Sequence, residues 1–192
     1  MTIDGRHGAV FERLDGPTLS ALVDQSCDLD DLAEKFVELQ VRLQAVTLPG
    51  IPGLVSRLES ELARSGLSFV VRSELSDVLL ELAAGSPSQL CHYDFHPDNI
   101  IVTDRGWVVI DWLTAANGPP VADLARSLLL RADAHEPTTL TFCDAVRRVG
   151  QQLHAIDDAQ LFAWTRVLAG ARLAEGFDGA YGTWLAGIAS GA

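Results

Sequence analysis

The chain has 192 residues, which is enough for one domain with a substantial buried core. Apolar residues make up 48% of the sequence and charged residues 21%, a balance that indicates a folded globular protein and excludes a disordered one. The formal net charge of −12 argues against binding to nucleic acid or to an anionic membrane surface, since both need clustered lysine and arginine.

The acidic balance is compatible with a small cationic substrate, although solubility alone is the better explanation of it. Three widely spaced cysteines, Cys27, Cys91 and Cys143, form no metal-ligand pattern and are typical of buried thiols in a reducing cytoplasm. The N-terminus has no apolar signal region, and no run of 18 apolar residues occurs in the chain. We therefore expect a cytoplasmic protein with no membrane-spanning segment.

The first part of the chain predicts a strand followed by helices. Residues Gly8–Leu14 indicate a short strand, and Asp15–Pro17 indicate a turn. A helix with one buried face is predicted from Leu29, capped by Asp28 or Asp30 and ended by Pro49–Gly50. The residues with helical spacing on this face are Leu29, Leu32, Phe36, Leu39, Leu43 and Val46.

Two more amphipathic helices are predicted before the pattern changes. They are separated near Ser65–Gly66 and closed by Gly85–Pro87. The positions that define them are Leu54, Leu58, Glu61, Leu62, Leu75, Val78, Leu79 and Leu82. Between residues 89 and 111, two short apolar runs, Ile100–Val102 and Trp107–Ile110, joined by a turn at 104–106, predict a β-hairpin.

The remainder of the chain is predicted to be helical. After Pro119–Pro120 the helical period resumes, and three or four helices follow to about residue 189, with a break near Gly176–Gly179. No internal repeat or linker is evident. The sequence therefore predicts one α+β domain over residues 1–192, mostly α-helical, that carries a small hairpin.

The polar residues around the hairpin suit phosphoryl transfer. Such a reaction needs a carboxylate that orients the acceptor hydroxyl, together with oxygen ligands for Mg²⁺. Asp94 precedes the hairpin and is the candidate for the first task. Asn99 and Asp111 stand at the entrance and exit of the hairpin, and hard oxygen donors of this kind are those that Mg²⁺ prefers. His96 has no second histidine or cysteine at ligand spacing, so we interpret it as a hydrogen-bonded loop residue.

The pattern H-x-D-x-x-x-x-N from His92 to Asn99, followed by an apolar strand that ends in Asp111, resembles the aminoglycoside phosphotransferase and choline kinase families. Three further stretches, VIDWLTAANGPPVADLARSLLL, FERLDGPTL and ARLAEG, are similar to other parts of the large lobe of those kinases. The resemblance covers nearly the whole chain and implies a protein-kinase-like C-terminal lobe. It implies a hinge strand at about 8–15, a catalytic and metal segment at 89–123 and a helical substrate region at 124–190.

The resemblance also implies roles for individual residues. Asp94 would be the catalytic base, and Asn99 and Asp111 would bind Mg²⁺ and, through it, ATP. The backbone of Glu12 and Leu14 would contact the adenine at the hinge. The loop-bracing residues would be His92 and Asp123. The short loop from Asp111 to Asp123 favours a small hydroxyl-bearing acceptor over a peptide, and the late helices that would bind it contain Asp133, Glu136, Asp144, Asp157, Asp158 and Trp164.

The families that the chain resembles also have an N-terminal lobe whose lysine clamps the phosphates. This chain has a single lysine, Lys35, on the first long predicted helix, and few residues precede the predicted hinge strand. Two hypotheses stay open. The chain is an ATP- and Mg²⁺-dependent phosphotransferase whose missing lobe is supplied by a partner chain or lost from the gene model, or it is a non-catalytic remnant that binds a ligand or protein. Both predict a dimer or a partner chain.

Overall fold

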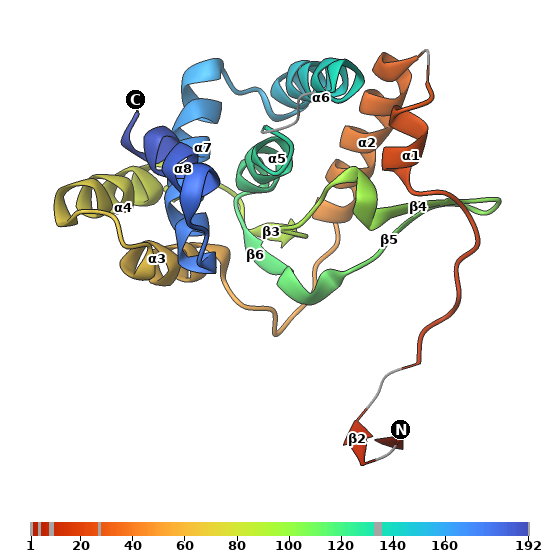
Figure 1. The fold of residues 1–192 in the computed structure, drawn as a ribbon, viewed down its shortest axis with the longest axis horizontal. Helices are drawn as coiled ribbons and strands as arrows, with labels where there is room; N and C mark the ends of the chain where they lie inside the picture. The colour runs from red at the N-terminus through yellow and green to blue at the C-terminus, as the bar shows by residue number, and fades with distance from the viewer. Residues whose placement is uncertain (1, 4, 8–9, 27, 133–135, 192) are drawn as a thin grey trace.

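The computed structural model describes residues 2–3, 5–7, 10–26, 28–132 and 136–191. Eight α-helices and three two-stranded antiparallel pairs occur in these residues (Figure 1). The helices are α1 (Leu19–Val23), α2 (Leu29–Gln44), α3 (Leu54–Arg64), α4 (Phe69–Ala83), α5 (Pro120–Leu129), α6 (Pro137–His154), α7 (Asp158–Arg172) and α8 (Gly179–Ser190). The strands are β1 (Thr2–Ile3), β2 (Arg6–His7), β3 (Gln89–Cys91), β4 (Ile100–Thr103), β5 (Gly106–Val109) and β6 (Ala116–Gly118).

The helices pack into two hydrophobic cores that share α5. One core lies among α3, α4, α7 and α8, and the other lies among α1, α2, α6 and the β4–β5 hairpin (Figure 1). Helix α5 serves both, because Ala122, Ala125 and Leu129 face the first core and Leu124 faces the second. A mostly helical domain with a small hairpin was predicted, and the structure confirms this fold class.

Close packing of α7 depends on a glycine. A Cβ built on Gly170 would lie 2.7 Å from Leu75 Cδ1 and 3.0 Å from Leu62 Cδ2. Both leucines are buried in the first core and have little room to move. Gly170 therefore allows α7 to approach α3 and α4 closely.

Most predicted helices and the hairpin are confirmed. Helix α2 begins at Leu29 with Asp28 as its cap, since the Asp28 carboxylate accepts the backbone N–H of Asp31 at 3.0 Å. The hairpin pairs Ile100 with Val109 and Thr103 with Gly106 in register. The β3–β6 pair was not predicted, because strands of three residues carry too little periodicity to be read from sequence.

The strand predicted at Gly8–Leu14 is wrong for the part that the structure describes. Residues 10–14 belong to no strand, and Gly8 and Ala9 lie outside the described residues. An extended segment becomes a strand only where a neighbour satisfies its backbone groups. The chain pairs with β4 only after the predicted strand has ended. Val102 N donates to Pro17 O at 2.9 Å, and Thr18 forms an isolated bridge with Ile101. Phe11 is 85% exposed, so no sheet covers it.

Candidate active site

The loop from His92 to Asn99, between β3 and β4, is anchored in both cores. Tyr93 is buried in the first core, and Phe95 is buried in the second, where its ring lies 4.6 Å from that of Phe36. Asp94 stands between these two anchors and remains partly exposed. The alternation of buried and accessible side chains holds the Asp94 carboxylate at the surface of the loop.

His92 lies beneath this loop and connects it to the end of the hairpin. Its Nε2 is 2.9 Å from Ile110 O, and its Nδ1 is 3.3 Å from the backbone nitrogen of Asp94. Because a carbonyl only accepts, Nε2 carries the hydrogen and Nδ1 accepts the N–H of Asp94. The ring therefore links the Asp94 backbone to the residue just before Asp111.

Asp123, in the first turn of α5, also supports the loop from below. Its carboxylate accepts the backbone N–H groups of His92 at 3.2 Å and Tyr93 at 2.7 Å, and the Gln40 side-chain amide at 3.2 Å. Burial raises the pKa of this carboxyl, whereas the N–H groups that it accepts favour the ionised form. Asp123 thus accepts hydrogen bonds from loop N–H groups that are buried away from solvent.

Tyr93 has a backbone φ of 64°, in the left-handed region that disfavours residues with a Cβ. Its hydroxyl donates to Glu61 Oε2 at 3.1 Å, and its ring lies 4.7 Å from the Arg126 guanidinium. This turn of the backbone places the Tyr93 ring in the first core while Asp94 faces outward.

The Asp94 carboxylate is held by two neighbours. Asn99 Nδ2 donates to Asp94 Oδ2 at 3.1 Å and to the Asp94 carbonyl at 2.9 Å. His96 Nε2 lies 3.6 Å from Asp94 Oδ2. The interaction with His96 lowers the pKa of the Asp94 carboxyl, and burial opposes it. Asp94 is therefore ionised at neutral pH and fixed in direction.

Asn99 and Asp111 are brought together by the hairpin. Asn99 O accepts the backbone N–H of Ile110 at 3.0 Å, one step beyond the Ile100–Val109 pair. Asp111 comes next, with φ 60° and ψ 62°, an unfavourable backbone conformation that is found preferentially at functional sites. Its carboxylate is exposed and accepts no hydrogen bond from any residue that the structure describes. The hairpin thus brings the backbone of Asn99 beside Ile110, the residue before Asp111, and the Asn99 side chain contacts Asp94.

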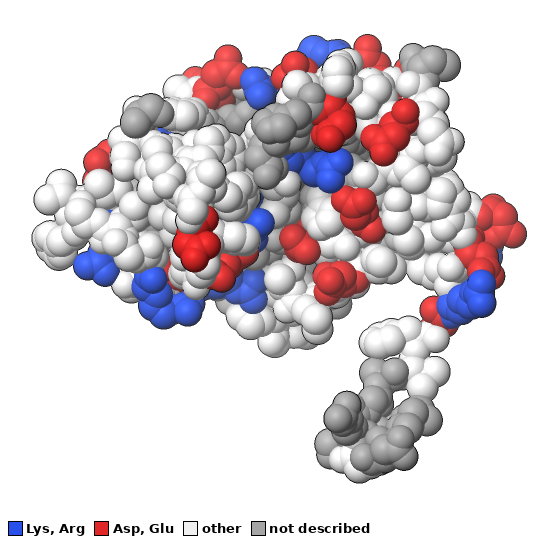
Figure 2. Space-filling view, viewed as in Figure 1, with Lys and Arg blue, Asp and Glu red and all other residues white. Residues whose placement is uncertain are grey.

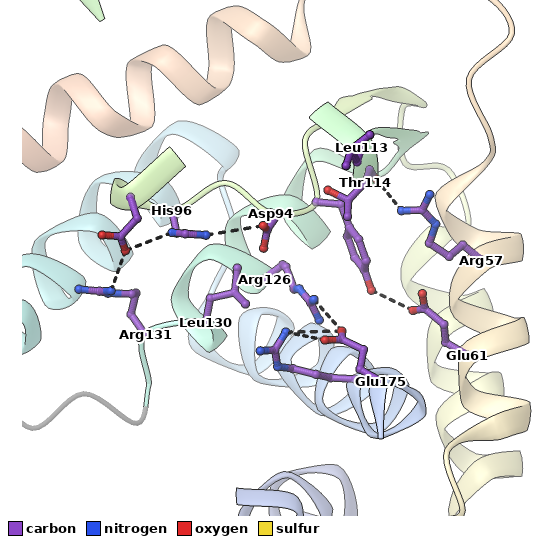
Figure 3. Close-up of a pocket in the computed structure, with 13 residues that line it drawn as sticks. Arg57, Glu61, Asp94, His96, Leu113, Thr114, Arg126, Leu130, Arg131 and Glu175 are labelled. Atoms are coloured by element: carbon purple, nitrogen blue, oxygen red, sulfur yellow. Dashed lines mark hydrogen bonds and ion pairs between the residues drawn. The ribbon is translucent and has the colours of Figure 1, made fainter. Parts of the chain in front are cut away.

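A cavity of about 590 Å³ opens beside Asp94 (Figure 3). It is walled by α3, α5, the end of α7 and the segment after Asp111, and neither Asn99 nor Asp111 lines it. Its charged lining residues are Arg57, Glu61, Asp94, Asp98, Arg126, Arg131, Arg172 and Glu175. Asp94 thus borders the cavity, whereas the Asn99–Asp111 pair lies outside it.

The other residues singled out from the sequence lie elsewhere. The Glu12 carboxylate pairs with Arg105 at the turn of the hairpin, the end opposite to Asn99. With strands of four residues, that separation is on the order of 10 Å. Leu14 is half-buried, and Trp164 is buried in the first core. Glu136, Asp144, Asp157 and Asp158 do not line the cavity, and Asp133 lies outside the described residues.

Several cavity residues were missed from the sequence. Arg57 on α3 carries no motif. Arg126 lies within the stretch similar to the kinases, but only the packing of α5 beside the loop from His92 to Asn99 shows that it lines the cavity. Glu61 had a signal, because it is a charged residue on a helix face otherwise occupied by leucines.

Comparison with known proteins decides the family. The family model described as the phosphotransferase enzyme family (APH) matches residues 2–169. The chain belongs to this phosphotransferase family. A search of curated proteins found no match. In the part of the chain that the structure describes, no helix is long and apolar enough to cross a membrane, and no three His, Cys, Asp or Glu side chains cluster as a metal site would.

Solved structures of similar fold include kinases of this kind. Choline kinase LicA from Streptococcus pneumoniae matches with a TM-score of 0.58 and 19% identity over 85% of this chain and 65% of the LicA chain. A thermostable mutant of aminoglycoside phosphotransferase APH(4)-Ia, in its apo form, matches with a TM-score of 0.62 and 19% identity over 94% of this chain and 71% of that chain. A ternary complex of that protein with AMP-PNP and hygromycin B matches at 0.63, with 19% identity over 93% of this chain and 68% of that chain.

These matches show the fold of this chain, which belongs to the phosphotransferase family. Its helices and small antiparallel strand pairs correspond to the kinase-like C-terminal region of the solved structures. The chain spans about two thirds of their length. The predicted resemblance to aminoglycoside phosphotransferases and choline kinases is confirmed at the level of family and fold.

Proposed function

We propose that this phosphotransferase family chain transfers a phosphoryl group from ATP to a hydroxyl of a small molecule, with Mg²⁺ as cofactor. The observation that carries the proposal is the position of Asp94. Its carboxylate borders a cavity large enough for a small acceptor and contacts Asn99, whose carbonyl accepts the N–H of Ile110, the residue before Asp111. In this proposal Asp94 stands between the acceptor cavity, which it lines, and Asn99, which lies outside the cavity.

Asp94 suits the role of catalytic base. Because its pKa is lowered, it is ionised at neutral pH and can accept a hydrogen bond from an acceptor hydroxyl in the cavity. A weak base takes the proton late, when the hydroxyl oxygen has already begun to bond to phosphorus. Asn99 and His96 keep the carboxylate from turning away. His92 and Asp123 are proposed to fix the loop that carries it.

Asn99 and Asp111 fit a magnesium ion. With Nδ2 of Asn99 directed at Asp94, its Oδ1 is left for another partner, and the Asp111 carboxylate is unengaged among the described residues. Carboxylate and amide oxygens are hard donors of the kind that Mg²⁺ takes in small number. The ion, when bound, would neutralise charge on the ATP phosphates. The backbone of Glu12 and Leu14 is proposed to contact the adenine.

The alternative is a family member that binds a ligand or protein without catalysis. It is favoured by the position of Lys35, the only lysine of the chain. Lys35 lies on the exposed face of α2 and pairs with Asp31 at 2.6 Å, so it does not line the cavity beside Asp94. No described residue therefore supplies the lysine that clamps phosphates in complete kinases.

Calorimetry of ATP binding to the whole chain, with and without Mg²⁺, distinguishes the phosphotransferase proposal from the non-catalytic alternative. Asp111→Asn keeps a residue that tolerates the left-handed backbone but removes the charge. We expect Mg²⁺-dependent binding that weakens about tenfold or more in this variant, the loss of one charged contact. Asp144→Asn, an exposed aspartate on α6, is the matched control and should bind as the wild type does. Absence of Mg²⁺-dependent binding in the wild type would favour the non-catalytic alternative.

A further inference from the structure

The cavity beside Asp94 is rich in arginine. Arg57 from α3, Arg126 from α5, Arg131 just after α5 and Arg172 from α7 all line it. The whole chain has 14 lysine and arginine residues against 26 acids, yet here four arginines meet four acids. The net charge of the molecule therefore does not describe this cavity.

The carboxylates of the cavity already have partners. Glu175 accepts from Arg126 at 2.8 Å and from Arg172 at 3.1 Å (Figure 3). Asp98 accepts from Arg131 at 3.1 Å, and Glu61 accepts the Tyr93 hydroxyl. Together with the contacts of Asp94 described above, these interactions give each of the four carboxylates at least one partner within the chain.

The guanidinium groups, in contrast, have unused donors. Arg126 is 4% exposed, and its Nε and Nη1 have no hydrogen-bond partner among the described residues. The Nε of Arg131 is likewise without a partner. Arg57 donates through Nη1 to the Thr114 carbonyl and pairs with no described carboxylate. Buried N–H groups without partners are costly, so a ligand that accepts from them is favoured.

Arg57 and Arg126 each lie against the aromatic ring of Tyr93. The guanidinium carbons lie 5.4 Å and 4.7 Å from the centroid of Tyr93. Contacts of this kind orient a planar guanidinium without consuming its donors. At the cavity wall, Arg57 and the Nε and Nη1 of Arg126 thus have N–H groups that no described carboxylate accepts.

We infer that the acceptor carries an oxyanion, either a carboxylate or a phosphate, in addition to the hydroxyl that hydrogen-bonds to Asp94. Arg57 and Arg126 recognise this oxyanion. The inference rests on the proposed function, in which the acceptor is the small molecule whose hydroxyl receives the phosphoryl group. An oxyanion offers only acceptor atoms and matches the planar fork of arginine in two bonds at once. A cationic acceptor, which the acidic sequence allowed, would find the carboxylates of this cavity already partnered and would add no acceptor for the unpaired guanidinium N–H groups.

Binding of four small probes to the whole chain tests the inference. They are glycerate with a carboxylate, glycerol 3-phosphate with a phosphate, glycerol without charge and choline with a cation. Titration followed by NMR, without nucleotide or Mg²⁺, should show both anionic probes binding at least tenfold more tightly than glycerol and choline, a ratio typical of a charge-assisted bond. The tighter of the two anions identifies which oxyanion the site prefers.

Arg57→Gln should weaken both anionic probes about tenfold and leave glycerol and choline unchanged. Arg148→Gln is the control, because Arg148 is an exposed arginine paired with Asp30 outside the cavity. The inference would be overturned if choline or glycerol bound as tightly as the anionic probes, or if neither anion bound. It would also be overturned if Arg57→Gln left anion binding unchanged. Because no nucleotide is present, these outcomes are distinct from failure of the Mg²⁺-dependent site at Asp111.

Discussion

Tyr93 combines an unfavourable backbone with a favourable side chain. A residue with a Cβ costs about 1–2 kcal/mol in the left-handed region. In return, the ring is 3% exposed, lies near two arginines and bonds Glu61 through its hydroxyl. Strain of this kind persists where the surroundings over-determine the conformation. The side chain of Tyr93 therefore stabilises a backbone shape that directs Asp94 outward.

Replacing Tyr93 by glycine and by alanine separates the two contributions. Both variants lose the ring, so both should be destabilised by roughly 3–5 kcal/mol, as for other buried aromatics. Glycine adopts a positive φ without steric cost, so Tyr93→Gly should be about 1 kcal/mol more stable than Tyr93→Ala. Urea unfolding measures the difference. Equal stability, or a more stable alanine variant, would show that the backbone is not strained here.

His154 makes stability depend on pH at the end of α6. Its ring is partly buried, its Nε2 has no hydrogen-bond partner among the described residues, and burial lowers its pKa from the usual 6.5. As the pH falls through 6.5, the unfolded chain binds a proton that the folded chain does not. The free energy of unfolding therefore decreases until the lower folded-state pKa is reached.

The variant His154→Gln should remove this dependence. Between about pH 7.5 and about pH 5.5, the wild type should lose more of its unfolding free energy than the variant does. Chemical denaturation at both pH values gives the comparison, and the remaining histidines contribute to both proteins alike. A larger loss in the variant than in the wild type would mean that the folded state prefers the charged ring.

Two glycine-to-alanine substitutions, one on α7 and one on α8, test how closely these helices pack against their neighbours. Gly170→Ala adds a methyl group against Leu62 and Leu75, which should cost about 1–3 kcal/mol although alanine favours helix. Gly187→Ala on α8 meets open space and should stabilise by about 0.5–1 kcal/mol. Thermal unfolding of the two variants should therefore move in opposite directions. A rise in melting temperature for both would contradict the close approach of α7 to α3 and α4.

Local pattern predicted most elements but not their contacts. Helix α2 and the β4–β5 hairpin followed from apolar spacing and turn residues, because both are stabilised by neighbours in sequence. The strand at 8–14 failed because a strand requires a distant partner, which the pattern does not contain. The motif gave Asp94, Asn99 and Asp111, whereas Arg57 and Arg126, 69 residues apart in sequence, meet at Tyr93 only in the folded chain.

At the scale of the whole molecule, the candidate site lies where the two cores adjoin. The loop carrying Asp94 has one anchor in each core. Helix α5 contributes Asp123, which accepts backbone N–H groups of this loop, and Arg126, which lines the cavity with Asp94 (Figure 3). Figure 2 shows acidic and basic side chains interspersed across the face seen in Figure 1. Leu113, at the cavity rim, is 92% exposed. A single exposed leucine is ordinary on a protein surface, so the partner chain expected from the sequence stays a prediction.

The most direct test of the account locates the metal ion itself. Mn²⁺ takes the same hard oxygen ligands as Mg²⁺ and broadens the NMR signals of nearby nuclei. With ATP and Mn²⁺ added to the whole chain, we predict that the amide signals of Asn99 and Asp111 broaden first, while that of Asp144 on α6 stays sharp. Broadening centred on other acidic residues, with Asn99 and Asp111 unaffected, would contradict the assignment of this hairpin as the metal-binding part of a phosphotransferase site.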